Sequence, residues 1–187
     1  MEMAIRTRRW TRADLARLPD DGNRYEVLDG ELFVTPQAAY AHQSVAMRLM
    51  FALQHYCVQL DIGEVVGPGA VVWEKNELQP DVQIIPGRHE PRRETKWDDL
   101  PHPILVVEVL SDSTRRRDFG KKRDAYARIL IPTYWIVDIE KRAVVVWTAG
   151  SPEPEFITDV LRWPPMAGIA PLEIRLAGIF GPAPAQP

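Results

Sequence analysis

The segment 103–110 (PILVVEVL) constrains the fold most, because every residue in it is apolar except Glu108. A short β-branched run between a proline and the polar residues 111–113 predicts a strand buried on both faces. An ionised carboxylate in such a strand costs several kcal/mol unless a basic group, a shared proton or a metal ion compensates it. Glu108 therefore indicates either a functional site or a buried salt bridge to an arginine.

A second acid, Asp81, stands in a similar setting upstream. It follows Pro80 directly and opens the run Val-Gln-Ile-Ile at 82–85. Two strands that bring one carboxylate each to the same edge of a sheet can hold Mg²⁺ or Mn²⁺, which prefer carboxylate and water ligands. We expect Asp81 and Glu108 to share one cation at the carboxyl ends of adjacent strands. The alternative for Asp81 is a capping role in a turn.

Length and composition are those of a globular protein. With 187 residues, of which 45% are hydrophobic, the chain can bury a core. We expect one domain over 1–187, with its core at about 11–180 and a flexible, proline-rich tail at 181–187. The formal net charge of -3 excludes general attraction to nucleic acid, so such contact requires a local basic patch.

The single cysteine, Cys57, excludes an intramolecular disulfide and favours a reducing compartment. It lies in an apolar helical pattern, which favours a buried structural thiol. Since no apolar run approaches the roughly 20 residues that span a bilayer, we expect a cytoplasmic protein.

Periodicity and turn residues predict a mixed α/β or α+β chain with a mixed central sheet. The expected helices lie at 11–18, 40–60 and about 111–130, where caps or glycine and proline mark the ends. Hairpins are expected at 24–34, turning at Asp29-Gly30, and at 134–147. Further strands are expected at 64–73, with a Gly-Pro-Gly interruption at 67–69, and at 156–163 and 171–176; another strand begins at Asp81. A long polar loop is expected at 86–103.

The helix expected after the Glu108 strand carries two candidate lysines. Asp118, Lys122, Tyr126 and Leu130 recur every four residues. We expect Tyr126 and Leu130 to face the sheet and Asp118 to hold the Lys122 ammonium. If that helix overhangs the carboxylates, Lys122 could orient the attacking water or stabilise charge developing on a phosphate. The alternatives are an ordinary exposed Asp118–Lys122 pair, or the same role for Lys121, which a one-residue shift would exchange with Lys122.

Two further residues have open interpretations. Glu26, in the first hairpin, is either a third acid for the cation or a solvated strand residue. His42 opens the long helix, and a lone histidine is more often structural or solvated than catalytic. The sequence contains no HxxxH or CxxC zinc motif, no glycine-rich phosphate loop and no GxSxG elbow.

Several short motifs occur in order along the chain and together resemble a known family. They are RYEVLDGEL at 24–32, His42, Pro80-Asp81-Val82, VEVLS at 107–111, Asp118-x-x-x-Lys122-x-x-x-Tyr126 and YWIVD at 134–138. This set is similar to the Uma-two family, a restriction-endonuclease-like group within the PD-(D/E)XK nuclease superfamily. The similarity extends over about 11–180.

The resemblance implies an α/β, restriction-endonuclease-like fold: a mixed central β-sheet flanked by helices, with a metal-dependent phosphodiesterase core. It assigns Asp81 and Glu108 as the paired acids and Glu26 as an additional acid. The superfamily usually places a lysine two residues after the glutamate, where this chain has Leu110. The family's own pattern moves that lysine to the next helix, which fits Lys122.

We therefore expect an endonuclease that hydrolyses phosphodiester bonds in nucleic acid, DNA rather than RNA, with Mg²⁺ or Mn²⁺ as cofactor. The expected catalytic residues are Glu26, Asp81, Glu108 and Lys122, and the metal ligands are Asp81, Glu108 and Glu26. Arg115, Arg116 and Arg117 would hold phosphate or form a solvated basic run. A homodimer follows only from the resemblance.

Two other interpretations remain open. The first is a non-catalytic nucleic-acid or protein binding module on the same fold, which the acidic net charge and the missing strand lysine favour. The second is a metal-free hydrolase that uses two carboxylates as acid and base. Neither the binding module nor the metal-free hydrolase requires a divalent ion, so a requirement for Mg²⁺ or Mn²⁺ distinguishes the nuclease from both.

Overall fold

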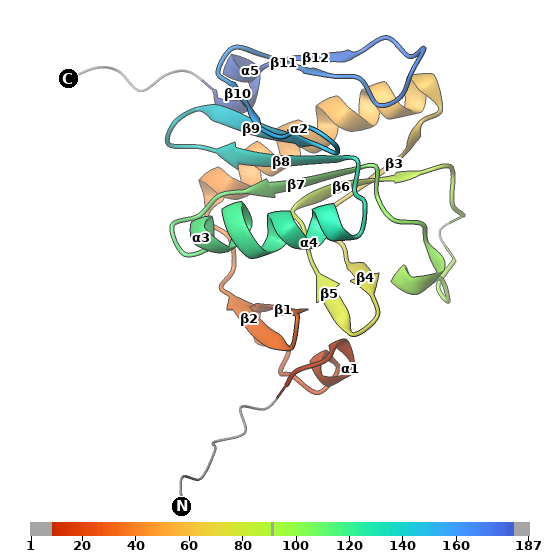
Figure 1. Ribbon diagram of the computed structural model, residues 1–187, viewed down its shortest axis with the longest axis vertical. Helices are drawn as coiled ribbons and strands as arrows, with labels where there is room; N and C mark the ends of the chain where they lie inside the picture. The colour runs from red at the N-terminus through yellow and green to blue at the C-terminus, as the bar shows by residue number, and fades with distance from the viewer. Residues whose placement is uncertain (1–8, 91, 182–187) are drawn as a thin grey trace, which may run out of the picture.

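The computed structural model describes residues 9–90 and 92–181. Its central element is a six-stranded mixed sheet with the order β10-β9-β8-β7-β6-β3 (Figure 1). Strands β7 and β8 run parallel, and the other neighbours run antiparallel. The strands are β3 (Gly63–Val66), β6 (Val82–Pro86), β7 (Leu105–Val109), β8 (Thr133–Asp138), β9 (Ala143–Thr148) and β10 (Glu155–Ile157).

Helices cover both faces of this sheet. Parallel neighbours need a crossover connection, which here consists of α3 (Arg115–Arg117), a π-helical turn (Asp118–Lys122) and α4 (Arg123–Arg128). This connection lies in front of the sheet in Figure 1, and α2 (Tyr40–Leu60) lies behind it. Strand β7 is therefore enclosed on both faces, and all its residues are buried, as its apolar sequence predicts.

The two layers bury two separate cores. Leu105, Val107 and Val109 of β7 pack with the α2 side, together with Leu49 and Trp135. Val106 and Leu110 pack with the α4 side. Since side chains alternate along a strand, Glu108 faces the α4 side, where the crossover helix can supply a partner.

A smaller four-stranded sheet, ordered β2-β1-β5-β4, lies below the central sheet in Figure 1. Its hairpin turns at Asp29 and Gly30, both of which have positive φ, as a tight hairpin turn requires. Thr11 N–H donates to Asp14 Oδ2 at 3.0 Å and begins the adjacent helix. The elements are α1 (Arg12–Leu15), β1 (Arg24–Leu28), β2 (Glu31–Thr35), β4 (Val71–Trp73) and β5 (Asn76–Leu78).

The remaining elements pack near α2 at the top of Figure 1. They are β11 (Val160–Trp163), β12 (Leu172–Arg175) and α5 (Leu176–Phe180), and α5 was not predicted. Among the described residues, no helix combines the length and apolar character needed to cross a membrane.

The long helix, both hairpins and the interruption at 67–69 are confirmed, but the assignment of each of two segments to one strand is wrong. Segment 64–73 divides into β3 and β4, and segment 156–163 divides into β10 and β11, with each half in a different sheet. In the first, the Gly67-Pro68-Gly69 interruption redirects the chain. Except for Gly181, the predicted flexible tail lies outside the described residues.

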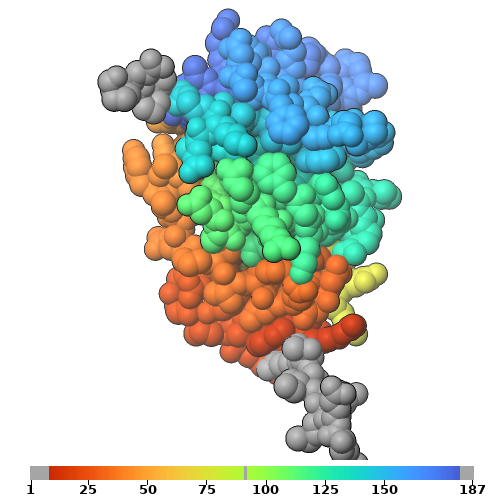
Figure 2. Space-filling view, turned by 60° about the vertical axis from the view of Figure 1, so that its left-hand side comes forward, coloured from red at the N-terminus to blue at the C-terminus, as the bar shows by residue number. Residues whose placement is uncertain are grey.

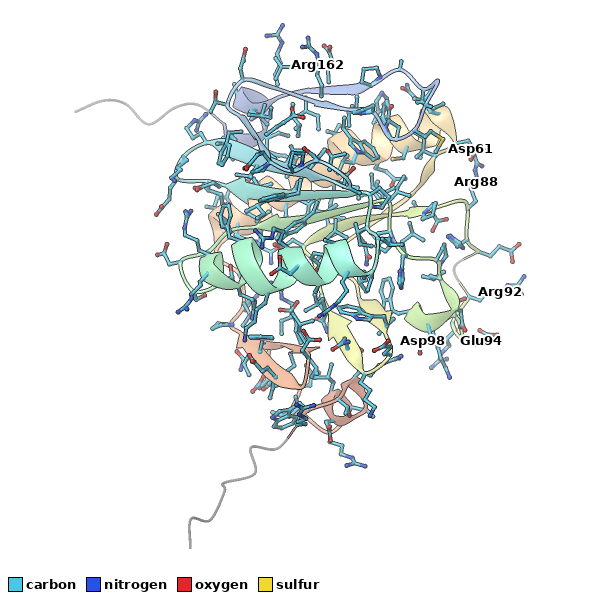
Figure 3. The ribbon with its side chains drawn as sticks, in the orientation of Figure 1. Asp61, Arg88, Arg92, Glu94, Asp98 and Arg162 are labelled. Carbon is cyan, nitrogen blue, oxygen red and sulfur yellow. The ribbon has the colours of Figure 1, made fainter. Side chains whose placement is uncertain are left out.

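The polar loop after β6 contains the short 3-10 helix Trp97–Asp99. Figure 3 shows Asp61, Arg88, Arg92 and Glu94 at the molecular edge opposite to α3. Arg88 Nε lies 2.6 Å from Asp61 Oδ1, and Arg92 is paired with Glu90. This loop therefore contributes no arginine to the site described below.

Cys57 provides a test of the packing beneath α2. Its side chain is fully buried, and burial raises the pKa of the thiol to about 11. Because the thiolate is the reactive form, Cys57 should resist a thiol-specific reagent at mildly alkaline pH in the native protein. It should react fully in concentrated guanidinium. Rapid labelling of the native protein would show that this core opens.

Candidate active site

The site forms where β7 ends and β6 begins. Asp81 immediately precedes β6, and its N–H donates to the carbonyl of Val107 at 3.1 Å. Its Oδ2 accepts the N–H of Val109 at 2.8 Å. Asp81 is thus bonded to the residues on both sides of Glu108. The structure places the two acids side by side. Because β6 and β7 are antiparallel, Asp81 lies at the amino end of β6 and Glu108 near the carboxyl end of β7. The prediction that both acids lie at carboxyl ends of strands is therefore wrong.

Asp81 is held as an ionised group. Arg24 Nη1 donates to Oδ1 at 2.8 Å, and His42 Nε2 lies 3.1 Å from Oδ2. Burial alone would raise the pKa of Asp81, but the hydrogen bond with His42 and the charge of Arg24 lower it to about 2. Arg24 and His42 were not predicted as partners. Arg24 could have been found, because it stands two residues before Glu26 on the same strand, where side chains share a face.

Glu108 has the opposite character. It is 2% exposed, and its Oε1 accepts hydrogen bonds from Lys122 Nζ at 2.7 Å and Tyr126 Oη at 3.1 Å. Burial raises the pKa of Glu108 to about 8; the charge of Lys122 opposes the rise, and the nearby carboxylates add to it. Two neighbouring acids with pKa values pushed apart are typical of a functional site.

Lys122, rather than Lys121, points to the acids. The π-helical turn places the Lys122 ammonium, which is fully buried, 2.8 Å from Glu26 Oε1 and 2.7 Å from Glu108 Oε1. Burial opposes the charge, but the surrounding carboxylates raise the pKa of Lys122 to about 12. Lys121 instead forms an exposed ion pair with Glu31. Turns of this kind are frequent at functional sites.

The predicted lysine geometry is confirmed only in part. Asp118 Oδ1 forms the expected ion pair with Lys122 Nζ at 4.0 Å, but Glu26 and Glu108 are the closer partners. Leu130 was expected to face the sheet in the same row, but it is 81% exposed with a positive φ. The helix ends before Leu130, so the row stops at Tyr126.

The structure engages Glu26 with other partners and does not group it with Asp81 and Glu108. Its Oε1 also accepts the N–H of Gln79 at 2.8 Å, and its Oε2 lies 3.2 Å from Arg117 Nη2. Burial acts to raise the pKa of Glu26, but Lys122 and Arg117 lower it overall. In residues 9–90 and 92–181, no three acidic, histidine or cysteine side chains form a group that could hold a metal ion. Instead of a cluster of three acids, the structure has an ion-pair network in which the Lys122 ammonium links Glu26 to Glu108.

A cavity of about 360 Å³ opens beside Glu108. Its wall combines Ser111, Ser113 and Thr114 with Arg115, whose Nη1 lies 3.0 Å from Asp138 Oδ2. Figure 2 shows this face, with the green residues at the start of α3 above the orange residues of the β1–β2 region. The cavity therefore pairs an acid with hydroxyl groups and a guanidinium.

The predicted three-arginine run divides into three environments. Arg115 lines the cavity, Arg116 is exposed, and Arg117 contacts Glu26 and donates to Thr35 Oγ1 at 3.0 Å. Arg115 is thus the member of the run placed to meet a ligand in this cavity.

Asp81 and Glu108 are suited to a hard cation. No hydrogen bond within the described part of the chain reaches Glu108 Oε2, and Glu108 lines the cavity. Asp81 Oδ1 accepts a hydrogen bond from Arg24 alone and retains a lone pair. Carboxylate oxygens of this kind are preferred ligands of Mg²⁺ and Mn²⁺.

Comparison with known families identifies the group. The Uma2 family model, described as "Putative restriction endonuclease", matches residues 12–175. The chain belongs to the Uma2 family. The resemblance inferred from the motifs is confirmed.

Two individual proteins are also similar. "Uncharacterized protein slr1290" of Synechocystis is 30% identical over 109 residues, which cover 56% of this chain and 54% of that protein. The chain thus matches about half the length of this relative. A solved structure from Anabaena variabilis, described as a "putative nuclease belonging to DUF820", has a TM-score of 0.73 at 14% identity and covers 91% of this chain and 97% of its own. This likeness confirms the restriction-endonuclease-like fold.

The raised pKa of Glu108 predicts a pH-dependent stability without metal. The folded protein keeps the Glu108 proton up to about pH 8, whereas the unfolded chain loses it near the ordinary pKa of 4.5. The protonated Glu108 therefore stabilises the fold fully below pH 4.5, and this stabilisation is lost as the pH rises to about 8. The free energy of unfolding should fall by up to about 1.4 kcal/mol per pH unit in this interval.

Glu108→Gln should remove this slope, because the amide has no proton to lose. Urea denaturation of wild type and variant across the interval, with a chelator present, measures the difference. Identical pH profiles would show that Glu108 is ionised in the folded protein.

Proposed function

We propose that this Uma2 protein is a Mg²⁺- or Mn²⁺-dependent endonuclease that hydrolyses phosphodiester bonds in nucleic acid. The observation that carries the proposal is the adjacency of Asp81 and Glu108, together with the cavity that Glu108 lines with a guanidinium and hydroxyl groups. The acids suit a divalent cation, and the guanidinium and hydroxyl groups suit a phosphate. The family description supports the same chemistry, and the chain shares its fold with the Anabaena protein described as a putative nuclease.

In this proposal Asp81 and Glu108 hold the ion, which when bound polarises a scissile phosphate and lowers the pKa of a coordinated water. Arg24, His42 and the Val109 N–H keep Asp81 ionised and fixed. Glu108 would have to lose its proton to hold the ion, so the affinity for the ion should rise as the pH approaches 8.

Lys122 acts through Glu108. Its ammonium is fully buried, so it fixes Glu108 Oε1 and leaves Oε2 to face the cavity. Glu26 holds the same ammonium from the other side and serves as a positioning residue. Arg115, supported by Asp138, would bind non-bridging phosphate oxygens by charge and hydrogen bonding.

The binding-module interpretation is the second candidate. The observation that favours it is that both Asp81 oxygens already accept hydrogen bonds, and the strand position two residues after Glu108 is the apolar Leu110. This candidate requires no divalent-ion affinity, so metal binding separates it from the nuclease.

Glu108→Gln should abolish Mn²⁺ binding while the protein stays folded. The amide keeps the shape of the side chain and can still accept hydrogen bonds from Lys122 and Tyr126, but it removes the charge that compensates the ion. Isothermal titration with Mn²⁺ measures the loss. Glu31→Gln, which changes an exposed acid, is the matched control. Unchanged Mn²⁺ affinity in Glu108→Gln would contradict the assignment.

Lys122→Ala should reduce Mn²⁺-dependent cleavage of an oligonucleotide by about 10²–10³, the usual cost of losing one charged group at an active site. Lys121→Ala should leave the cleavage rate nearly unchanged, because Lys121 pairs only at the surface. Circular dichroism and Mn²⁺ titration show whether Lys122→Ala remains folded. Lys122→Arg keeps the charge and tests the position of the ammonium if the alanine variant unfolds. Equal activity in all three variants would contradict a role for Lys122.

A further inference from the structure

A second cavity of about 280 Å³ adjoins the first at the acid pair. Both cavities are lined by the same set of residues where they meet: Arg24, Pro36, Gln37, Ala38 and His42. Glu108 lines the first cavity and Asp81 lines the second. A ligand that reaches the acids can therefore extend into either space.

The second cavity has a different chemistry from the first. Its outer wall consists of Ala46, Met47 and Met50 of α2, facing Gly67 and Pro68. Its charged lining groups, Arg24 and Asp81, are bonded to each other at 2.8 Å, and Gln37 and Gln43 supply amides. Apolar surface with a few amide groups suits the face and edge of a nucleobase rather than a phosphate.

An exposed aromatic residue lies next in sequence to two residues that line the first cavity. Tyr40, in the first turn of α2, is 87% exposed and lies between Ala39 and Ala41, which line the first cavity. Phe51 is 76% exposed on the same helix. Exposed rings beside a groove act as stacking platforms for the bases of single strands.

The charges near the cavities do not suit an intact duplex. Arg24, Arg115, Arg117 and Lys121 are each paired with a carboxylate, so that of the arginines at 115–117 only the exposed Arg116 forms no ion pair within the described residues. Duplex binding relies on cations that neutralise several phosphates at once. Because Glu108 is also only 2% exposed, the scissile phosphate must enter a recess. An unpaired strand can bend its backbone into such a recess, whereas a stacked duplex resists this deformation.

We propose that the substrate is an unpaired nucleic-acid strand and that the second cavity binds the nucleobase next to the scissile phosphate. This inference rests on the proposed nuclease function. DNA and RNA share the base and backbone chemistry used here, and the experiment distinguishes them.

The first test compares binding and cleavage of one sequence as single-stranded DNA, single-stranded RNA and blunt duplex DNA. Fluorescence anisotropy with Glu108→Gln measures binding without turnover, and wild type with Mn²⁺ measures cleavage. We expect at least one single strand to bind, and to be cleaved, about ten-fold better than the duplex. Equal or tighter duplex binding would overturn the inference.

The two proposals fail differently. Glu108-dependent cleavage that prefers the duplex contradicts the single-strand inference and leaves the nuclease function intact. Single-strand binding without any Glu108-dependent cleavage contradicts the nuclease and supports the second candidate.

The second test concerns the ring and the base cavity. Tyr40→Ala should weaken single-strand binding about ten-fold, whereas Tyr40→Phe keeps the ring and should bind as wild type does. An abasic nucleotide next to the scissile position should slow cleavage more than one placed elsewhere in the strand. Equal affinity of the alanine and phenylalanine variants, together with no positional effect of the abasic site, would overturn the base-binding role.

Discussion

The buried ammonium of Lys122 is the interaction on which the site depends. It joins Glu26 of the lower sheet to Glu108 of the central sheet, and it is delivered by the crossover helix between β7 and β8. Removing one member of a buried ion network leaves an uncompensated charge that costs about 3–5 kcal/mol. The same contact therefore holds three parts of the chain together and orients the acid that faces the cavity.

The antiparallel pairing of β6 and β7 determines where Asp81 lies relative to Glu108. Because β6 begins where β7 ends, Asp81 bonds to the backbone on both sides of Glu108. Its neighbours Arg24 and His42 keep it ionised, whereas Glu108 lies in an enclosed setting that favours its protonated form. At neutral pH the site thus presents an ionised carboxylate, Asp81, next to a carboxyl group that favours its protonated form, Glu108. That difference makes the charge of the site depend on pH.

Most cations around the cavities are balanced by carboxylates, in agreement with the net charge of -3. Affinity for a polyanion must then come from a few directed contacts rather than from a basic surface. The apolar second cavity and the exposed ring of Tyr40 offer contacts of that kind. Substrate choice would then follow from the conformation of the strand more than from its charge.

The sequence by itself determined the elements that depend on local chemistry. The bounds of the helix at 40–60, the turn at Asp29-Gly30 and the burial of the strand around Glu108 follow from periodicity, turn residues and the cost of an apolar environment for a carboxylate. The sequence also favoured Lys122 over Lys121, because Asp118 stands one turn before Lys122; helical phase alone separated the two lysines only weakly.

Only the tertiary structure decided which groups meet. The partnership of Glu26 with Lys122, the pairing of Asp81 with Arg24 and His42, and the division of two predicted strands between sheets all depend on contacts between distant segments. Such contacts follow from strand order and register, which no local pattern specifies. The sequence therefore fixes which residues are available for chemistry, and the packing of the two sheets against the crossover helix fixes their partners.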